Sequence, residues 1–234
     1  REDPAVKGLL YAGTENGMYV SYNDGASWEA FQNNLPIVPI TDLTIKDNSL
    51  IVATQGRSLW MVDDLTVLHQ LLADEKSSAK TPRLFDPKDA YRTKGRGGRS
   101  SLTAGTNLPN GVITHFYLPE GMEKDSVVLN YHNAAGEVLA SYSNKAKERS
   151  KKLTLDKGAN TFVWDTRGTG AERLKGMILW WANLDGPKAV PGAYKVSMSV
   201  GDQTIATHDF SILADPRAEA SVADMQAQYD FITK

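Results

Sequence analysis

The chain has 234 residues, of which 41% are hydrophobic and 23% charged, and its formal net charge is −2. These values are ordinary for a globular protein, and the small negative charge gives no sign of a nucleic-acid or anionic-membrane partner. There is no cysteine, which excludes disulfides, thiolate metal sites and cysteine nucleophiles. No apolar run reaches the roughly 18 residues of a membrane-spanning helix, so we expect no membrane span. Because the net charge is slightly negative, we also expect no nucleic-acid partner.

The first 31 residues alternate between short apolar stretches and turn-forming residues. This pattern predicts strands over residues 8–14 and 18–22 and a third strand that reaches Phe31. We expect Glu15-Asn16-Gly17 to form the first hairpin turn, because an Asn-Gly pair tolerates the positive φ angles of a tight turn.

A distinctive string, Ser21-Tyr22-Asn23-Asp24-Gly25-Ala26-Ser27-Trp28, precedes the third strand. We expect Asn23 to bind backbone amides of its own turn, Gly25 to have a positive φ, and Trp28 to fold beneath the hairpin. The string resembles the Asp-box, or BNR repeat, Ser/Thr-x-Asp-x-Gly-x-Ser/Thr-Trp, with Asn in place of the usual Asp. The resemblance implies a structural role, rather than a catalytic one, for Ser21, Asn23, Asp24, Gly25, Ser27 and Trp28.

Residues 40–62 repeat the pattern of the first segment. Tyr11 and Val52 lie 41 residues apart at equivalent positions, as do Met18 and Leu59. A period of roughly 40–45 residues made of short strands is typical of β-propeller blades. We therefore predict two propeller-blade-like antiparallel sheets within residues 1–72, the second with strands over 40–45, 49–54 and 58–62.

The remainder of the chain predicts a β-sandwich. We interpret residues 73–99 as a linker with one bridging strand at 83–87, and residues 93–111 as a loop rich in Gly, Ser, Thr and Asn. Short apolar stretches separated by turn signals then predict a sandwich over residues 100–214, with Trp164 as a core anchor. The expected strands are 111–118, 126–131, 136–142, 158–164, 192–200 and 204–213.

Several motifs of this region resemble an immunoglobulin-like module. Asn133-Ala134-Ala135-Gly136, then Gly-x-Asn-x-Phe-x-Trp-Asp at 158–165, then Pro-Gly-x-Tyr at 191–194 look like that module in the flagellar hook-capping protein. The module also follows the propeller in large bacterial BNR-repeat proteins, which are labelled sortilin-like or glycosyl hydrolases. Those proteins have counterparts of 107–111, 164–167 and 215–217, although Leu108 stands where they usually have Pro. The resemblance implies an extracytoplasmic protein that is secreted, periplasmic or on the cell surface.

The two ends of the sequence carry their own signals. Ser221-Val222-Ala223-Asp224 is a capping box, and Met225, Tyr229 and Ile232 form one apolar stripe, so we predict a short helix within residues 215–234. The chain opens on Arg1-Glu2-Asp3-Pro4 without a Met or a signal peptide. We interpret it as a piece of a longer protein or as a mature product.

No carboxylate pair stands out as catalytic. Glycoside hydrolysis needs two carboxyl groups at a fixed separation across a sugar-sized cleft. Asp63 and Asp64 are adjacent at a strand end, so their side chains diverge. Asp165 lies beside Arg167, which favours an ion pair over an acid with a raised pKa. Asp185 is the remaining candidate, and we predict no catalytic residue in this chain.

The histidines and the basic residues give no clear site. No pair of histidines has the spacing of metal ligands, so we predict no metal and no cofactor. The basic cluster at 92–99 is interleaved with glycine, and we interpret it as a mobile loop, with a phosphate-binding groove as the alternative. The four histidines are His69, His115, His132 and His208.

Trp180 and Trp181 are the best candidates for binding a ligand by stacking on a sugar ring. Adjacent residues of an extended segment point to opposite faces, so we expect one ring in the core and the other exposed. Packing of the pair in the core or between domains is the alternative.

We therefore expect an all-β chain that is a non-catalytic structural or binding portion of an extracytoplasmic BNR-repeat protein. Its ligand is a carbohydrate or another protein. The alternative is the C-terminal part of a glycoside hydrolase whose active site lies mainly in blades outside this chain. Two blades leave apolar faces uncovered, so we also expect the sandwich to fold back over residues 1–72, or two chains to associate through those strands.

Overall fold

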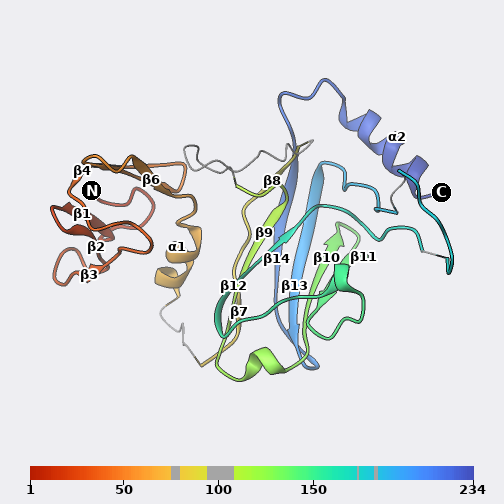
Figure 1. The fold of residues 1–234 in the computed structure, drawn as a ribbon, viewed down its shortest axis with the longest axis horizontal. Helices are drawn as coiled ribbons and strands as arrows, with labels where there is room; N and C mark the ends of the chain where they lie inside the picture. The colour runs from red at the N-terminus through yellow and green to blue at the C-terminus, as the bar shows by residue number, and fades with distance from the viewer. Residues whose placement is uncertain (75–79, 94–107, 173, 182–183) are drawn as a thin grey trace. The chain divides into compact units, whose positions relative to one another are not determined.

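The computed structural model describes residues 1–74, 80–93, 108–172, 174–181 and 184–234 (Figure 1). The chain divides into two compact units, Arg1–Ser77 and Ser78–Lys234, which are described separately. Antiparallel strands predominate, and the two α-helices are α1, Thr66–Ala73, and α2, Val222–Ile232. The predicted all-β fold is therefore confirmed. Within the described residues, no helix is long and apolar enough to cross a membrane.

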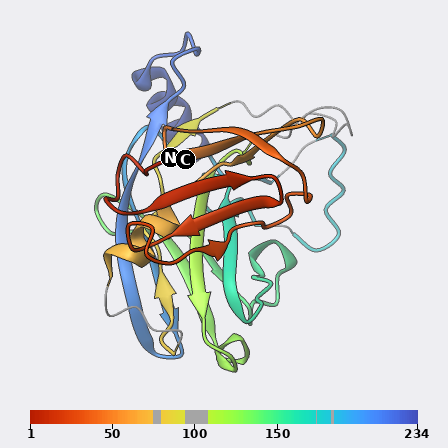
Figure 2. The same cartoon turned by 90° about the vertical axis from the view of Figure 1, so that its left-hand side faces the viewer.

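The first sheet of the first unit is a meander of β1 (Leu10–Thr14), β2 (Gly17–Ser21) and β3 (Glu29–Ala30). Figure 2 shows β1 and β2 side by side. Residues 1–3 continue the sheet beyond β1, because Arg1 and Tyr11 exchange two backbone hydrogen bonds of 2.8 Å and Asp3 donates one to Leu9. The predicted strands thus lie close to where the alternation placed them.

The first hairpin turn differs from the prediction. Thr14 pairs with Gly17, so Glu15 and Asn16 form the loop, and of the three predicted turn residues only Gly17 has a positive φ, 128°. Glycine suits this position because a φ of 128° is strained for a residue with a side chain. A turn with two positive φ angles occurs instead in the second sheet, at residues 47–48.

The second sheet contains β4 (Ile40–Lys46), β5 (Ser49–Thr54) and β6 (Leu59–Val62), again as an antiparallel meander. It shares a core with the first sheet. The sheets approach closely where Gly13 faces Ile40, since a Cβ on Gly13 would lie 2.4 Å from Cγ2 of Ile40. The buried residues of this core are Leu9, Tyr11, Met18, Val20, Leu43, Leu50, Val52 and Leu65.

The other face of β6 is uncovered. Leu59 and Met61 are 72% and 56% exposed, whereas Trp60 and Val62 pack against the core. The expectation that these strands carry apolar residues on both faces is confirmed. Association of two chains through these strands, and folding back of the sandwich over them, stay predictions.

The second unit is a sandwich of two sheets. One has the order β11-β10-β13-β14-β8 and the other β12-β9-β7, and Figure 1 shows β13 and β14 running side by side. Single turns of 3₁₀ helix lie at Met122–Lys124 and Arg149–Lys151. The strands are β7 (Arg83–Leu84), β8 (Ala90–Arg92), β9 (Val112–Leu118), β10 (Val127–Asn133), β11 (Val138–Ser143), β12 (Gly158–Trp164), β13 (Gly192–Val200) and β14 (Gln203–Ala214).

The sandwich draws on residues that the sequence assigned to a linker. β7 pairs with β9 in one sheet, and β8 pairs in parallel with β14 in the other. β8 was missed because three residues are too few to show an alternation of apolar and polar side chains. Most of the loop predicted over 93–111, and the basic residues of 94–99, lie outside the described residues.

Trp164 is the centre of the sandwich core, as predicted. Its side chain is fully buried and stacks on Tyr131 with ring centroids 4.5 Å apart. Its indole N–H donates to the carbonyl of Arg167 at 2.8 Å, and the Tyr131 hydroxyl meets Thr114 Oγ1 at 2.7 Å. Both polar groups of this aromatic core are therefore satisfied.

Helix α2 begins with the predicted capping box. The Asp224 amide donates to Ser221 Oγ at 3.2 Å, and the Ser221 amide donates to the Asp224 carboxylate at 2.9 Å. Of the predicted stripe, Met225 is buried and Tyr229 half-buried, but Ile232 is exposed. The stripe is therefore wrong at its last member, which lies at the end of the helix.

Candidate functional site

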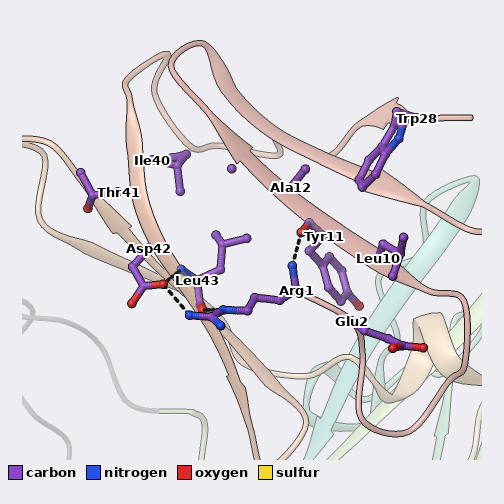
Figure 3. Close-up of a pocket in the computed structure, with 11 residues that line it drawn as sticks. Arg1, Glu2, Leu10, Tyr11, Ala12, Trp28, Ile40, Thr41, Asp42 and Leu43 are labelled. Atoms are coloured by element: carbon purple, nitrogen blue, oxygen red, sulfur yellow. Dashed lines mark hydrogen bonds and ion pairs between the residues drawn. The ribbon is translucent and has the colours of Figure 1, made fainter. Parts of the chain in front are cut away.

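An open cleft of about 550 Å³ lies in the first unit between β1 and β4 (Figure 3). The ladder of residues 1–3 along β1 carries Arg1 toward β4 and so helps to form one wall. The cleft is lined by Arg1, Glu2, Leu10, Tyr11, Ala12, Gly13, Trp28, Ile40, Thr41, Asp42 and Leu43.

The polar wall of the cleft is an ordered ion pair. The Arg1 guanidinium donates from Nη2 to Asp42 Oδ1 at 3.0 Å and from Nε to the Leu43 carbonyl at 2.9 Å. The Leu43 amide donates to the same carboxylate oxygen at 2.8 Å. This amide, followed by Arg1, lowers the pKa of Asp42 below its usual value. Asp42 is therefore a carboxylate at neutral pH and offers a hydrogen-bond acceptor rather than a proton.

The opposite end of the cleft is apolar. Figure 3 shows Trp28 on the far side from Asp42, at the end of the cleft where Leu10 of β1 also lies. The Trp28 side chain is 43% exposed. A Cβ on Gly25 would lie 3.9 Å from the Trp28 ring and 3.6 Å from Leu10, so one part of the ring covers this turn. The expectation that the ring lies beneath the hairpin is therefore right only for the part that packs on the turn at Gly25. The rest of the ring is exposed to solvent.

The turn over residues 21–28, which precedes β3 and ends on Trp28, is held by a network of short polar contacts. Asn23 Oδ1 accepts from the Ser27 amide at 2.9 Å, and Asn23 Nδ2 donates to Ser27 Oγ at 2.8 Å. The buried Ser21 hydroxyl accepts from the Gly25 amide at 2.9 Å. Gly25 has φ 85° and Asp24 has φ 57°. The predicted positive φ of Gly25 and the predicted hydrogen bond from a backbone amide to Asn23 are confirmed.

Trp180 and Trp181 lie on a loop of the sandwich and are both exposed, at 81% and 102%. The expectation of one ring in the core is wrong, and so is core packing of the pair. The described part of this segment is not a strand, so no alternation of faces applies. Leu174 and Ile178 of the same loop are exposed too, and both Trp rings are accessible to a ligand.

Two of the predicted carboxylate candidates, Asp64 and Asp165, have structural partners. Asp64 accepts from the Thr66 amide at 2.8 Å at the start of α1. Asp165 accepts from the Arg167 amide at 3.0 Å and lies 3.8 Å from Arg167 Nε, so the predicted corner ion pair is confirmed. Asp63 lies in the first unit beside Asp64, and Asp185 lies in the second. The pKa is lowered from its usual value in five described carboxyl groups, Asp3, Asp42, Glu148, Asp215 and Asp224.

A buried polar cluster around Asp3 has no counterpart in the sequence reasoning. Asp3 Oδ2 lies 2.8 Å from His69 Nε2 and accepts from the Tyr11 hydroxyl at 3.1 Å, while Oδ1 accepts from the amides of Ala5 and Val6. Burial raises the pKa of Asp3, but these hydrogen bonds and the charge of His69 outweigh it and lower the pKa. No local signal joins Asp3 to His69, because only the fold brings helix α1 to the start of the chain.

The other three histidines have separate partners. His115 meets Thr161 Oγ1 at 3.0 Å, and His132 meets Ser197 Oγ at 2.8 Å. His208 contacts Asp86 and the Leu84 carbonyl. Among the described residues, no three His, Cys, Asp or Glu side chains come together in a way that could hold a metal ion.

A scan against protein-family models finds no matching family, and a search of curated proteins finds no match. The resemblance to BNR-repeat proteins therefore stays a prediction, and the geometry of the cleft carries the functional argument.

Proposed function

We propose that this chain is a non-catalytic binding portion of an extracytoplasmic BNR-repeat protein, and that it binds a carbohydrate in the cleft between β1 and β4. The observation that carries the proposal is the pairing of the half-exposed Trp28 ring with the Arg1–Asp42 ion pair across one cleft. A sugar ring has an apolar C–H face and a rim of hydroxyl groups. The indole ring suits the face, and the charged groups suit the rim.

The size and order of the cleft support this choice. A volume of about 550 Å³ lies within the range of small-ligand sites. Asp42 is held by both Arg1 and the Leu43 amide, so a ligand meets an acceptor that is already positioned. Binding then costs little side-chain ordering, which favours affinity for a small polar ligand.

The lowered pKa of Asp42 argues against its acting as a general acid. A glycosidase needs one carboxyl group whose raised pKa keeps it protonated as a general acid. The pKa of Asp42 is lowered by the Leu43 amide and by Arg1. Glu2, the other carboxylate of the cleft, accepts a hydrogen bond from the Gly8 amide at 3.3 Å.

The binding test compares two tryptophans. The full chain is titrated with a panel of neutral oligosaccharides by calorimetry, and Trp28→Ala is set against Trp181→Ala, which removes an exposed ring from the other unit. We expect Trp28→Ala to weaken binding roughly tenfold or more and Trp181→Ala to leave it unchanged. The reverse result would place the ligand on the Trp180–Trp181 loop, and absence of binding to any glycan would overturn the proposal.

A glycoside hydrolase remains the second candidate, because two carboxylates, Glu2 and Asp42, line the same cleft. Its active site would then be completed by further blades. Aryl glycosides and polysaccharides are incubated with the chain and with Glu2→Gln and Asp42→Asn. Turnover above a buffer blank that either substitution abolishes would make the chain catalytic and would replace the binding proposal.

A further inference from the structure

Three cationic side chains gather at one corner of the sandwich, although they are far apart in the sequence. Arg92 ends β8, Arg167 follows the Trp164 strand, and Lys188 precedes β13. Arg167 and Lys188 form an isolated antiparallel bridge pair. Arg92 Nε donates to the Ala189 carbonyl at 3.0 Å, and Lys188 Nζ donates to the Thr93 carbonyl at 2.9 Å. These contacts place the three charges side by side.

The positive charge of this corner is incompletely balanced. Asp165 Oδ2 lies 3.8 Å from Arg167 Nε, and its side chain is largely exposed. Burial, followed by the charges of Arg167 and Arg92, lowers the pKa of Lys188, and Asp165 is the group that opposes them. Among the described charges that act on Lys188, two further cations outnumber one carboxylate, so a bound anion would relieve the repulsion among the three cations.

The cations are held in place by hydrogen bonds that, among the described residues, use only some of their donors. Arg167 donates from NH1 to the Gly186 carbonyl at 2.7 Å, and Arg92 donates from NH2 to Gln228 Oε1 at 3.1 Å. A guanidinium has five N–H groups and an ammonium three, so these bonds orient the side chains without exhausting their donors. All three residues are half-buried, which strengthens their field relative to that of fully solvated charges.

We propose that Arg92, Arg167 and Lys188 form a binding site for an oxyanion, either a free sulfate or phosphate ion or a sulfate ester on a glycan. Two guanidinium forks and one ammonium provide the charge-assisted donors that such a group accepts. The site lies in the second unit, and the inference goes beyond the carbohydrate cleft and does not depend on it.

The first experiment is a titration of the full chain with sodium sulfate and sodium phosphate, at ionic strength held constant with chloride. Amide NMR signals of Thr93, Gly168 and Ala189 report on the corner. We expect saturable shifts with a dissociation constant on the order of 1 mM. Shifts that stay linear well above that concentration, or that spread evenly over the surface, would overturn the site.

Lys188→Gln is the loss-of-charge variant, and Lys157→Gln is its matched control. Lys157 lies at the opposite end of β12 from Trp164 and pairs with Glu120 at 3.7 Å. We expect Lys188→Gln to weaken sulfate binding at least roughly fivefold, and Lys157→Gln to leave it unchanged. Equal weakening in both variants would mean non-specific screening and would overturn the proposal.

If Lys188→Gln lowers the melting temperature, its weaker sulfate binding could reflect partial unfolding. Asp165→Asn then provides a second test of the site. Asparagine retains the oxygen that accepts from the Arg167 amide but removes the competing negative charge. We expect roughly threefold to tenfold tighter sulfate binding. If the cations serve only to hold the 186–189 segment through its carbonyls, sulfate affinity will not change, and the proposal fails.

A pair of oligosaccharides distinguishes the two possible ligands, a free oxyanion and a sulfate ester on a glycan. A sulfated dextran fragment is compared with inorganic sulfate, and the unsulfated fragment serves as the control. Tighter binding of the sulfated fragment than of the ion identifies a glycan ester, and equal affinity per sulfate identifies the free ion. If the unsulfated fragment binds this corner as well as the sulfated one, the charge argument is wrong.

Discussion

The two units are stabilised by different chemistry. The sandwich buries a cluster of aromatic rings in which Trp164 stacks on Tyr131 and Tyr194 stacks on Phe210. The first unit shares a small apolar core between two sheets and in addition buries the carboxylate of Asp3, bonded to Tyr11 and His69. The stability of the sandwich therefore depends mainly on the packing of its aromatic rings, whereas that of the first unit depends also on the protonation of a buried carboxylate.

The largest effect is expected from Trp164→Ala. Removing a fully buried Trp leaves a cavity and an unpaired carbonyl at Arg167, so the free energy of unfolding of the sandwich should fall by roughly 3–5 kcal/mol. Denaturant unfolding followed by near-ultraviolet circular dichroism measures this loss. A melting temperature within a degree or two of wild type would mean that Trp164 is not the core anchor.

Gly25→Val should act on the first unit alone. A β-branched residue at φ 85° is strained, and we expect a loss of roughly 1–3 kcal/mol in the stability of the first sheet. Amide hydrogen exchange of β1 and β2 should accelerate while that of β9 to β14 is unchanged. Gly136→Val, at φ 86° in the turn before β11, is the matched control and should perturb the sandwich instead.

The two units should differ in how their stability responds to acid. The folded pKa of Asp3 lies below its ordinary value of 3.8, so its stabilising contribution is present above that pH and is lost as the pH falls through the folded pKa. We expect exchange in β1 and α1 to accelerate below about pH 4 before that of the sandwich.

Asp3→Asn should remove most of this acid sensitivity and lower stability at neutral pH. Asp42→Asn is the control, since Asp42 also has a lowered pKa but is exposed in the cleft. If Asp42→Asn abolishes the acid response and Asp3→Asn does not, the buried cluster is not its source.

The smallest effect is expected from Trp181→Ala. The ring is fully exposed on its loop, so the stability of the sandwich should change by less than about 0.5 kcal/mol. Thermal melting of this variant beside Trp164→Ala compares two tryptophans of one unit. A clear loss of stability in Trp181→Ala would show that the ring packs against the protein in solution.

Alternation and local turn chemistry made much of the fold predictable. β9 and β13 lie where the pattern placed them. Buried and half-buried residues alternate along the whole of β9, and β13 has several buried residues in its middle. The Asn23 network and the capping box at Ser221 were predictable because every partner lies within a few residues along the chain.

The candidate sites depend on contacts that the sequence does not encode locally. Arg1 meets Asp42, Asp3 meets His69, and Arg92 meets Ala189 only after the sheets have formed. The Trp180–Trp181 pair was misjudged for a related reason. Alternation is a property of strands, and that segment forms none among its described residues.

The placement of the tryptophans gives the protein a natural optical probe. Trp164 is sealed from water and stacked on Tyr131, so its fluorescence should be blue-shifted and inaccessible to a soluble quencher such as acrylamide. Trp180 and Trp181 are open to solvent, so their emission should be red-shifted and readily quenched. With the exposed rings quenched, the remaining short-wavelength emission comes from Trp164 and, in part, from the half-buried Trp60 of the first unit, and a Trp60→Phe variant leaves Trp164 as the reporter of the sandwich interior.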